Sequence, residues 1–210
     1  MTTRQYLYVN NFPIKRDIPE TPWMDEKGLE IFKLLAASSN CYLEFGSGGS
    51  TIYVAKNTNV KNIISIDSDK KWVQRITESL EPSKKEIALI HCDIGEVGNW
   101  GVPINKFHME NYHQYMSMPW EYANQKLLKP DLILVDGRFR VASFLYSLLC
   151  AENNTTILFD DYTERPEYFI VEKFCKLDHV AGRMGIFKAI KDYSIPEICK
   201  AIAKYSTNPD

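Results

Sequence analysis

Short runs of apolar residues recur along the chain, and each run is followed by turn residues and then by a segment with helical spacing. Unbroken apolar runs of this length suit strands that are covered on both faces, as in a parallel sheet. The pattern therefore predicts five buried strands, at residues 41–45, 62–66, 87–92, 131–135 and 156–159.

The segments between these strands have the periodicity of amphipathic helices. In residues 25–38, 69–80 and 139–151 the apolar positions fall on one helical face. Alternation of strands and helices predicts a doubly wound, Rossmann-like α/β sheet that is mostly parallel, with right-handed crossovers. From residue 177 onward the chain has the pattern of two short strands joined at Gly182–Gly185. We therefore expect one domain that spans residues 1–210.

Two segments stand outside this alternation. Residues 94–125 are rich in aromatic residues, Met and His, and a long loop within a compact domain is usually functional. We expect this insertion to line a binding site. Residues 1–24 form an N-terminal extension, of which residues 18–24 can close as a lid over a different site, that of the ligand held by the glycine-rich loop at Gly46–Gly49.

Composition and charge limit the classes of partner. The net charge of −2 gives no basic footprint for a nucleic acid, so none is expected. The N-terminus lacks the apolar region of a signal peptide, and no run approaches the roughly 20 apolar residues that span a bilayer. Five scattered cysteines without a CxxC pair suit a reducing compartment. We expect a cytoplasmic protein without a membrane partner; its oligomeric state is open, a homodimer included.

A glycine-rich loop follows the first predicted strand. Gly46, Gly48 and Gly49 allow backbone to approach a ligand closely, and Asp67 lies about 20 residues further on, as a ribose-binding carboxylate should. The loop has no lysine for a P-loop, and Thr51 stands at the third glycine of a dinucleotide fingerprint. Glu44 would repel a pyrophosphate but suits an ammonium or sulfonium group. The simpler alternative is a tight turn, with Asp67 as a helix cap.

Five motifs in order resemble those of class I S-adenosylmethionine-dependent methyltransferases: LEFGSGGST, SIDSD, HCDI, LILVDG and ILFDDY. The resemblance covers roughly residues 25–190. It implies a seven-stranded sheet whose last strand is antiparallel, which would account for the hairpin-like tail. It also implies that S-adenosylmethionine is bound by Glu44, Phe45, Gly46, Ser47, Gly48, Gly49, Asp67, Ser68, Asp93, Ile94 and Asp136.

Three acids follow the fourth and fifth predicted strands: Asp136, Asp160 and Asp161. Unpaired carboxylates at one sheet edge repel one another, and Mg²⁺ relieves this repulsion because it favours carboxylate oxygens. Adjacent residues can share an ion only where the strand has ended. The arrangement resembles metal-dependent O-methyltransferases of the catechol and sugar-modifying kinds. There the metal lowers the pKa of an acceptor hydroxyl.

Other roles remain open for these residues and their neighbours. Asp160 can bind the substrate directly, and Asp161 can pair with Arg138, Arg140 or Arg165. Arg138 and Arg140 either clamp an anionic acceptor or serve as ion-pair partners of the acids. The histidine that many sugar-modifying relatives carry after Asp-Gly is absent from DGRFR, so the candidate bases are His108 and His113. Two roles are open for the aromatic residues of the insertion: they form a wall of the acceptor site, or they pack against the domain. These residues are Trp100, Tyr112, Tyr115 and Trp120.

The sequence thus predicts an enzyme that transfers a methyl group from S-adenosylmethionine to a small-molecule acceptor, through a hydroxyl oxygen. The candidates for catalysis are Asp136, Asp160, Asp161, Arg138 and His113, with Mg²⁺ on the three acids. Two alternatives remain: a metal-independent N- or O-methyltransferase, and a non-catalytic protein that binds S-adenosylmethionine. An NAD-dependent oxidoreductase is disfavoured by Thr51.

Overall fold

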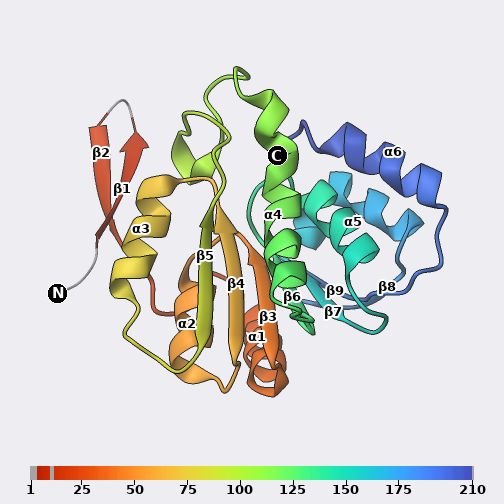
Figure 1. Ribbon diagram of the computed structural model, residues 1–210, viewed down its shortest axis with the longest axis horizontal. Helices are drawn as coiled ribbons and strands as arrows, with labels where there is room; N and C mark the ends of the chain where they lie inside the picture. Colours follow the sequence, from red (N-terminus) through yellow and green to blue (C-terminus); the bar gives the residue numbers. More distant parts are fainter. Residues whose placement is uncertain (1–3, 10–11, 210) are drawn as a thin grey trace.

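A computed structural model describes residues 4–9 and 12–209, and side chains from residue 18 onward. Its central feature is a seven-stranded sheet in the order β5-β4-β3-β6-β7-β9-β8 (Figure 1). The strands are β3 (Cys41–Phe45), β4 (Asn62–Asp67), β5 (Glu86–His91), β6 (Leu132–Val135), β7 (Thr156–Phe159), β8 (Leu177–Ala181) and β9 (Met184–Lys188). β3 to β7 pair in parallel, and β9 runs antiparallel to both β7 and β8. The predicted sheet is confirmed, including its antiparallel last strand.

Helices cover both faces of this sheet. They are α1 (Glu26–Ser38), α2 (Gly49–Asn57), α3 (Lys70–Ser79), α4 (Tyr112–Gln125), α5 (Arg140–Cys150) and α6 (Ile195–Tyr205), with short 3₁₀ helices η1 (Asn99–Gly101), η2 (Met109–Asn111), η3 (Tyr162–Glu164) and η4 (Pro166–Lys173). Alternate β3 residues point to opposite faces. Leu43 packs in the cluster that contains α4 and α5, whereas Tyr42 packs in the cluster that contains α1. A separate hairpin, β1 (Arg4–Val9) and β2 (Phe12–Asp17), precedes residue 18.

The expectation of a loop over residues 94–125 is wrong for its second half. Tyr112–Gln125 is the helix α4, and its aromatic residues Tyr112, Tyr115 and Trp120 are buried in the core. Their spacing fits one helical face, but Pro119 within the helix hides the pattern because proline usually breaks helices. Only residues 94–111 form the connecting segment. Among the described residues, no helix is both long enough and apolar enough to cross a membrane.

Candidate functional site

A cavity of about 1780 Å³ lies at the carboxyl ends of the parallel strands. Ligands bind at this edge of a doubly wound sheet, where successive crossovers diverge to opposite sides. Here β3 has β4 on one side and β6 on the other. The volume exceeds the roughly 300–1,000 Å³ of a single small-ligand pocket, so the cavity has room for two molecules.

The glycine loop is pressed between two other segments. Gly46 has a φ of +97°, and a Cβ on it would lie 2.7 Å from the Cα of Gly137 in the loop after β6. A Cβ on Gly49 would collide with the backbone of Thr21. Gly48 differs, because a Cβ there would meet nothing within 4 Å. Two of the glycines thus permit tight contacts within the protein, and the third faces open space.

Glu44 lies behind the cavity wall and not on it. Its carboxylate is buried and accepts hydrogen bonds from the Tyr42 hydroxyl at 2.7 Å, the Ser50 hydroxyl at 2.6 Å and the Thr51 hydroxyl. Burial raises the pKa of Glu44, and these hydroxyl donors oppose the shift. Two of the donors belong to α2, so Glu44 fastens the start of that helix to β3. Phe45 and Ile94, also predicted to contact the donor, are buried in the core.

The other residues predicted for the donor line the cavity: Gly46, Ser47, Gly48, Gly49, Asp67, Ser68, Asp93 and Asp136. Asp67 accepts hydrogen bonds from the backbone N–H of Ser47 at 3.1 Å and of Asp69 at 2.9 Å. Burial raises the pKa of Asp67 to about 7, against these two bonds. The Trp72 indole donates to the Ser47 carbonyl oxygen at 2.7 Å, which fixes the loop from the α3 side.

The three predicted acids come together at the ends of β6 and β7. Asp136, Asp160 and Asp161 offer carboxylate oxygens that lie within 4.8 Å of one another. β7 ends at Phe159, and Asp161 has a φ of +56°, so the two consecutive side chains need not point to opposite faces. Asp136 keeps 30% of its side chain accessible, whereas Asp160 is fully buried.

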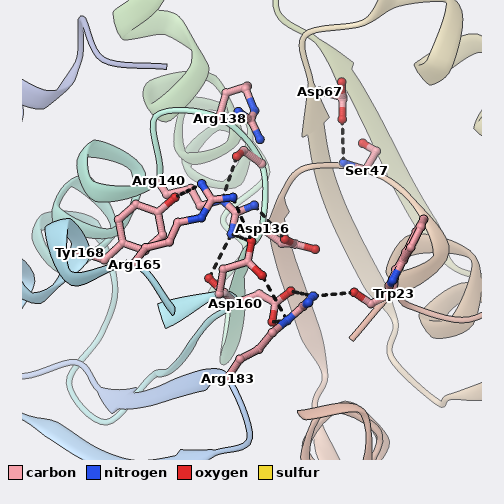
Figure 2. A network of polar contacts seen from close by, with 12 residues as sticks. Trp23, Ser47, Asp67, Asp136, Arg138, Arg140, Asp160, Arg165, Tyr168 and Arg183 are labelled. Atoms are coloured by element: carbon pink, nitrogen blue, oxygen red, sulfur yellow. Dashed lines mark hydrogen bonds and ion pairs between the residues drawn. The ribbon is translucent and has the colours of Figure 1, made fainter. Parts of the chain in front are cut away.

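Three arginines neutralise these acids, as Figure 2 shows. Arg140 is almost fully buried, and its Nη2 lies 3.2 Å from Asp136 while its Nη1 lies 3.0 Å from Asp161. Arg183 contacts both oxygens of Asp160, at 3.0 and 2.7 Å, and contacts Asp161 at 3.1 Å. Arg165 lies 3.4 Å from Asp161. The hypothesis that Arg140 and Arg165 are ion-pair partners of the acids is confirmed.

This donor set does not fit a magnesium ion. Mg²⁺ binds carboxylates that carry uncompensated negative charge and keeps several waters. Here three guanidinium groups balance three carboxylates, and Arg183 occupies both oxygens of Asp160, whose side chain has no solvent access. The resemblance to metal-dependent enzymes, which rested on the positions of the acids, does not extend to their surroundings.

Sequence reasoning missed Arg183, the partner of Asp160. It lies at the turn between β8 and β9, within the segment Gly182–Gly185, where the glycines indicated only a turn. Its contact with Asp160 depends on how β9 pairs with β7. No local pattern in the sequence carries that information.

The remaining candidates are divided between the cavity and other places. Arg138 lines the cavity, and its Nη1 donates to the Pro209 carbonyl oxygen at 3.3 Å. Trp100 and Tyr115 also line it, whereas Tyr112 and Trp120 belong to the core. The exposed His113 is not among the lining residues; its Nδ1 lies 2.7 Å from the Glu110 carbonyl oxygen. From the predicted lid, Pro19, Pro22 and Trp23 border the cavity.

Comparison with known proteins adds to this geometry. The chain is 28% identical to a methyltransferase-like protein from Silicibacter pomeroyi, with a TM-score of 0.82 over 90% of this chain and 100% of that one. The fold is that of class I methyltransferases. An O-methyltransferase from Bacillus cereus in complex with S-adenosylhomocysteine is a more distant neighbour, with 12% identity and a TM-score of 0.43 over 90% and 70% of the two chains. No protein-family model and no curated protein matches the sequence.

Proposed function

We propose that this protein binds S-adenosylmethionine beside β3 and β4 and transfers its methyl group to a small molecule held beside β6 and β7. One observation carries the proposal: a single cavity runs from the glycine loop and Asp67 to Asp136, at the edge where this fold binds ligands. The full-length similarity to a methyltransferase-like protein supports it.

The residues on the donor side suit the parts of S-adenosylmethionine. Asp67 offers carboxylate oxygens for the ribose hydroxyls, and Asp93 lies at the end of β5 for the adenine. The open face of Gly48 leaves backbone accessible to the methionine part. The bound donor supplies an electrophilic methyl group on a sulfonium. Glu44 acts from behind, by holding the loop to α2.

On the acceptor side, we assign Asp136 as the general base that accepts the proton of the acceptor. Burial raises its pKa above the usual range while Arg140 opposes the shift, and part of its side chain faces the cavity. A carboxylate with a raised pKa is a suitable general base. Asp136 accepts the proton of an acceptor hydroxyl as the oxygen attacks the methyl group and the sulfonium becomes a thioether. The other residues of the cavity contribute by holding donor and acceptor in the right orientation, which accounts for much of the acceleration in such transfers.

The ion pairs favour a metal-independent form of this reaction. Arg140 and Arg183 supply positive charge where the metal-dependent hypothesis requires a cation. Transfer to nitrogen is an alternative that fits the same residues, since Asp136 can also take a proton from an ammonium acceptor.

Calorimetric titration tests the donor. Wild-type protein is expected to bind S-adenosylmethionine and S-adenosylhomocysteine but not NAD, and Asp67→Asn is expected to weaken binding about tenfold, the loss of one charge-assisted hydrogen bond. Asp69→Asn is the matched control, because Asp69 lines the same cavity and Asn still caps α3. Binding of NAD in place of S-adenosylmethionine would overturn the proposal.

Catalysis needs a separate test, since a protein can bind the donor without transferring its methyl group. Labelled S-adenosylmethionine and a panel of small hydroxyl and amine acceptors are expected to give a labelled product. Asp136→Asn is expected to lose turnover by at least about a hundredfold, the usual contribution of a general base, while donor affinity is kept. Donor binding without transfer to any acceptor supports the non-catalytic alternative.

A further inference from the structure

The segment of residues 18–25, here called the strap, borders the proposed donor pocket through Pro19, Pro22 and Trp23. Thr21 and Pro22 lie against Gly49 at the start of α2. The Trp23 ring packs edge-to-face on Trp100, with ring centroids 6.1 Å apart, and Trp100 lies in η1, in the segment between β5 and α4. The two indoles therefore bound the cavity from two separate parts of the chain.

The strap is tied to the β8–β9 turn by Arg183. The Nη2 of Arg183 donates to the Trp23 carbonyl oxygen at 2.8 Å (Figure 2). The backbone N–H of Arg183 donates to Asp25 at 2.9 Å. Asp25 also accepts from the backbone N–H groups of Lys27 and Gly28, and so caps α1. Arg183 thus contacts the strap at two points, the Trp23 carbonyl oxygen and the Asp25 side chain.

Arg183 is itself held rigidly. Its guanidinium forms a two-point contact with Asp160, whose side chain is fully buried. Such charge-assisted, two-point bonds fix the orientation of the guanidinium plane as well as its position. The Trp23 ring, in contrast, is 68% exposed, so burial contributes little to fixing it. The hydrogen bond from Arg183 to the Trp23 carbonyl oxygen therefore adds a rigid anchor to the contacts that hold the strap at Trp23.

We propose that Arg183 is a positioning residue for the donor pocket: anchored on Asp160, it holds the strap so that Trp23 stays against Trp100 over the glycine loop. The role rests on the proposed function of this cavity. It gives the buried Asp160 a purpose other than binding a metal or the substrate.

The first test compares three single variants by circular dichroism and by donor titration, and a fourth variant, Trp100→Phe, identifies the circular dichroism signal. The exciton signal of the paired indoles is identified as the signal that Trp100→Phe removes. Arg183→Met is expected to remove the same signal. It is also expected to weaken S-adenosylmethionine binding about tenfold, which is equivalent to the loss of one hydrogen bond from a charged donor. Arg183→Lys should restore both in part, because an ammonium can still donate to Trp23. Arg165→Met is the control; it removes another ion pair to Asp161, at 3.4 Å, and should keep the signal and the affinity.

A second test removes the effect of a buried, unpaired charge. Arg183→Met leaves Asp160 without its partner, which can destabilise the fold. Arg183→Met with Asp160→Asn removes both charges, and it is expected to recover stability but neither the indole signal nor the affinity. Recovery of all three would overturn the proposal.

A mutant cycle decides whether Arg183 acts through Trp23. The losses of affinity in Arg183→Met and Trp23→Ala are expected to be non-additive, because both remove one contact chain. Additive losses would contradict the proposal. The indole signal is measured without a donor, so a wild type that binds no S-adenosylmethionine would overturn the proposed function and leave the positioning of Trp23 still under test.

Discussion

The two sides of the cavity are built from different interactions. On the side of β3 and β4, backbone N–H groups and hydroxyls meet single carboxylates: Ser47 donates to Asp67, and Ser50 donates to Glu44. On the side of β6 and β7, carboxylates meet guanidinium groups, as Arg140 does with Asp136. Figure 2 shows both arrangements, with the charged network apart from the Ser47–Asp67 contact.

The two sides therefore fix their residues in position by different means. Hydrogen bonds to backbone let a loop keep its shape while its outer face stays available to a ligand. A closed set of ion pairs neutralises its own charge, so its members position one another and only the partly exposed Asp136 remains suited to chemistry. Variants that break the ion pairs should therefore cost mainly stability, with Arg183 also affecting donor affinity through the strap. Variants that remove a hydrogen-bonding group on the other side, such as Asp67→Asn, should cost mainly donor affinity.

The largest effect is expected at Arg140. Arg140→Met removes a side chain that is 5% exposed and leaves Asp136 and Asp161 short of a partner. Breaking a buried ion pair costs about 3–5 kcal/mol, and we expect a loss of this size in the free energy of unfolding measured with denaturant. Lys129→Met is the control, because its ion pair with Glu152 is exposed and worth at most about 1 kcal/mol. Equal losses in the two variants would contradict the view of a closed network.

A smaller effect is expected in the glycine loop. Gly46→Ala places a Cβ 2.7 Å from Gly137 at a φ of +97°, and the two penalties together amount to about 2–4 kcal/mol. Gly48→Ala adds the same methyl group where nothing lies within 4 Å and should leave the unfolding free energy nearly unchanged. Thermal and denaturant unfolding of the two variants measure this difference. A destabilised Gly48→Ala would show that the loop has no open face.

The two sides also differed in how far the sequence could predict them. The strands, the glycine loop and Asp67 follow from local patterns, because an apolar run and the turn after it are adjacent in the chain. The positions of Asp136, Asp160 and Asp161 at the ends of their strands follow in the same way.

The contacts that Arg183 and Glu44 make could not be predicted from the sequence, because they depend on how distant strands pair and pack. Arg183 reaches Asp160 only once β9 has paired with β7, and Glu44 points away from the cavity because of the face that residue 44 occupies on β3. The helix α4 was missed for a local reason, the proline at position 119. Patterns along the chain thus located the acids and suggested Arg140 and Arg165 as their partners, but not Arg183, the partner of Asp160.

A third prediction concerns pH and the donor side alone. The pKa of Asp67 is raised to about 7. In the proposed donor complex, ribose hydroxyls would donate to its ionised form. S-adenosylmethionine affinity is therefore expected to rise with pH and to level off above pH 7, with a slope below that pH of at most about tenfold per unit. Titration calorimetry across this range measures the slope, which Asp67→Asn should flatten and Asp69→Asn should keep. A slope that survives Asp67→Asn would assign it to another group.

The smallest expected effect is that of magnesium, and it tests the charged side directly. In the wild type, three carboxylates face three guanidinium groups, so neither Mg²⁺ nor a chelator should shift the unfolding temperature. Arg183→Met removes one positive charge and uncovers both oxygens of Asp160, which leaves a net negative charge among the same three acids. This variant should gain a small stabilisation by Mg²⁺ that a chelator reverses, because a cation can then replace the missing guanidinium. A wild type that responds to Mg²⁺ as strongly as the variant would mean that the arginines do not compensate the acids, and the contrast between the two sides of the cavity would fail there.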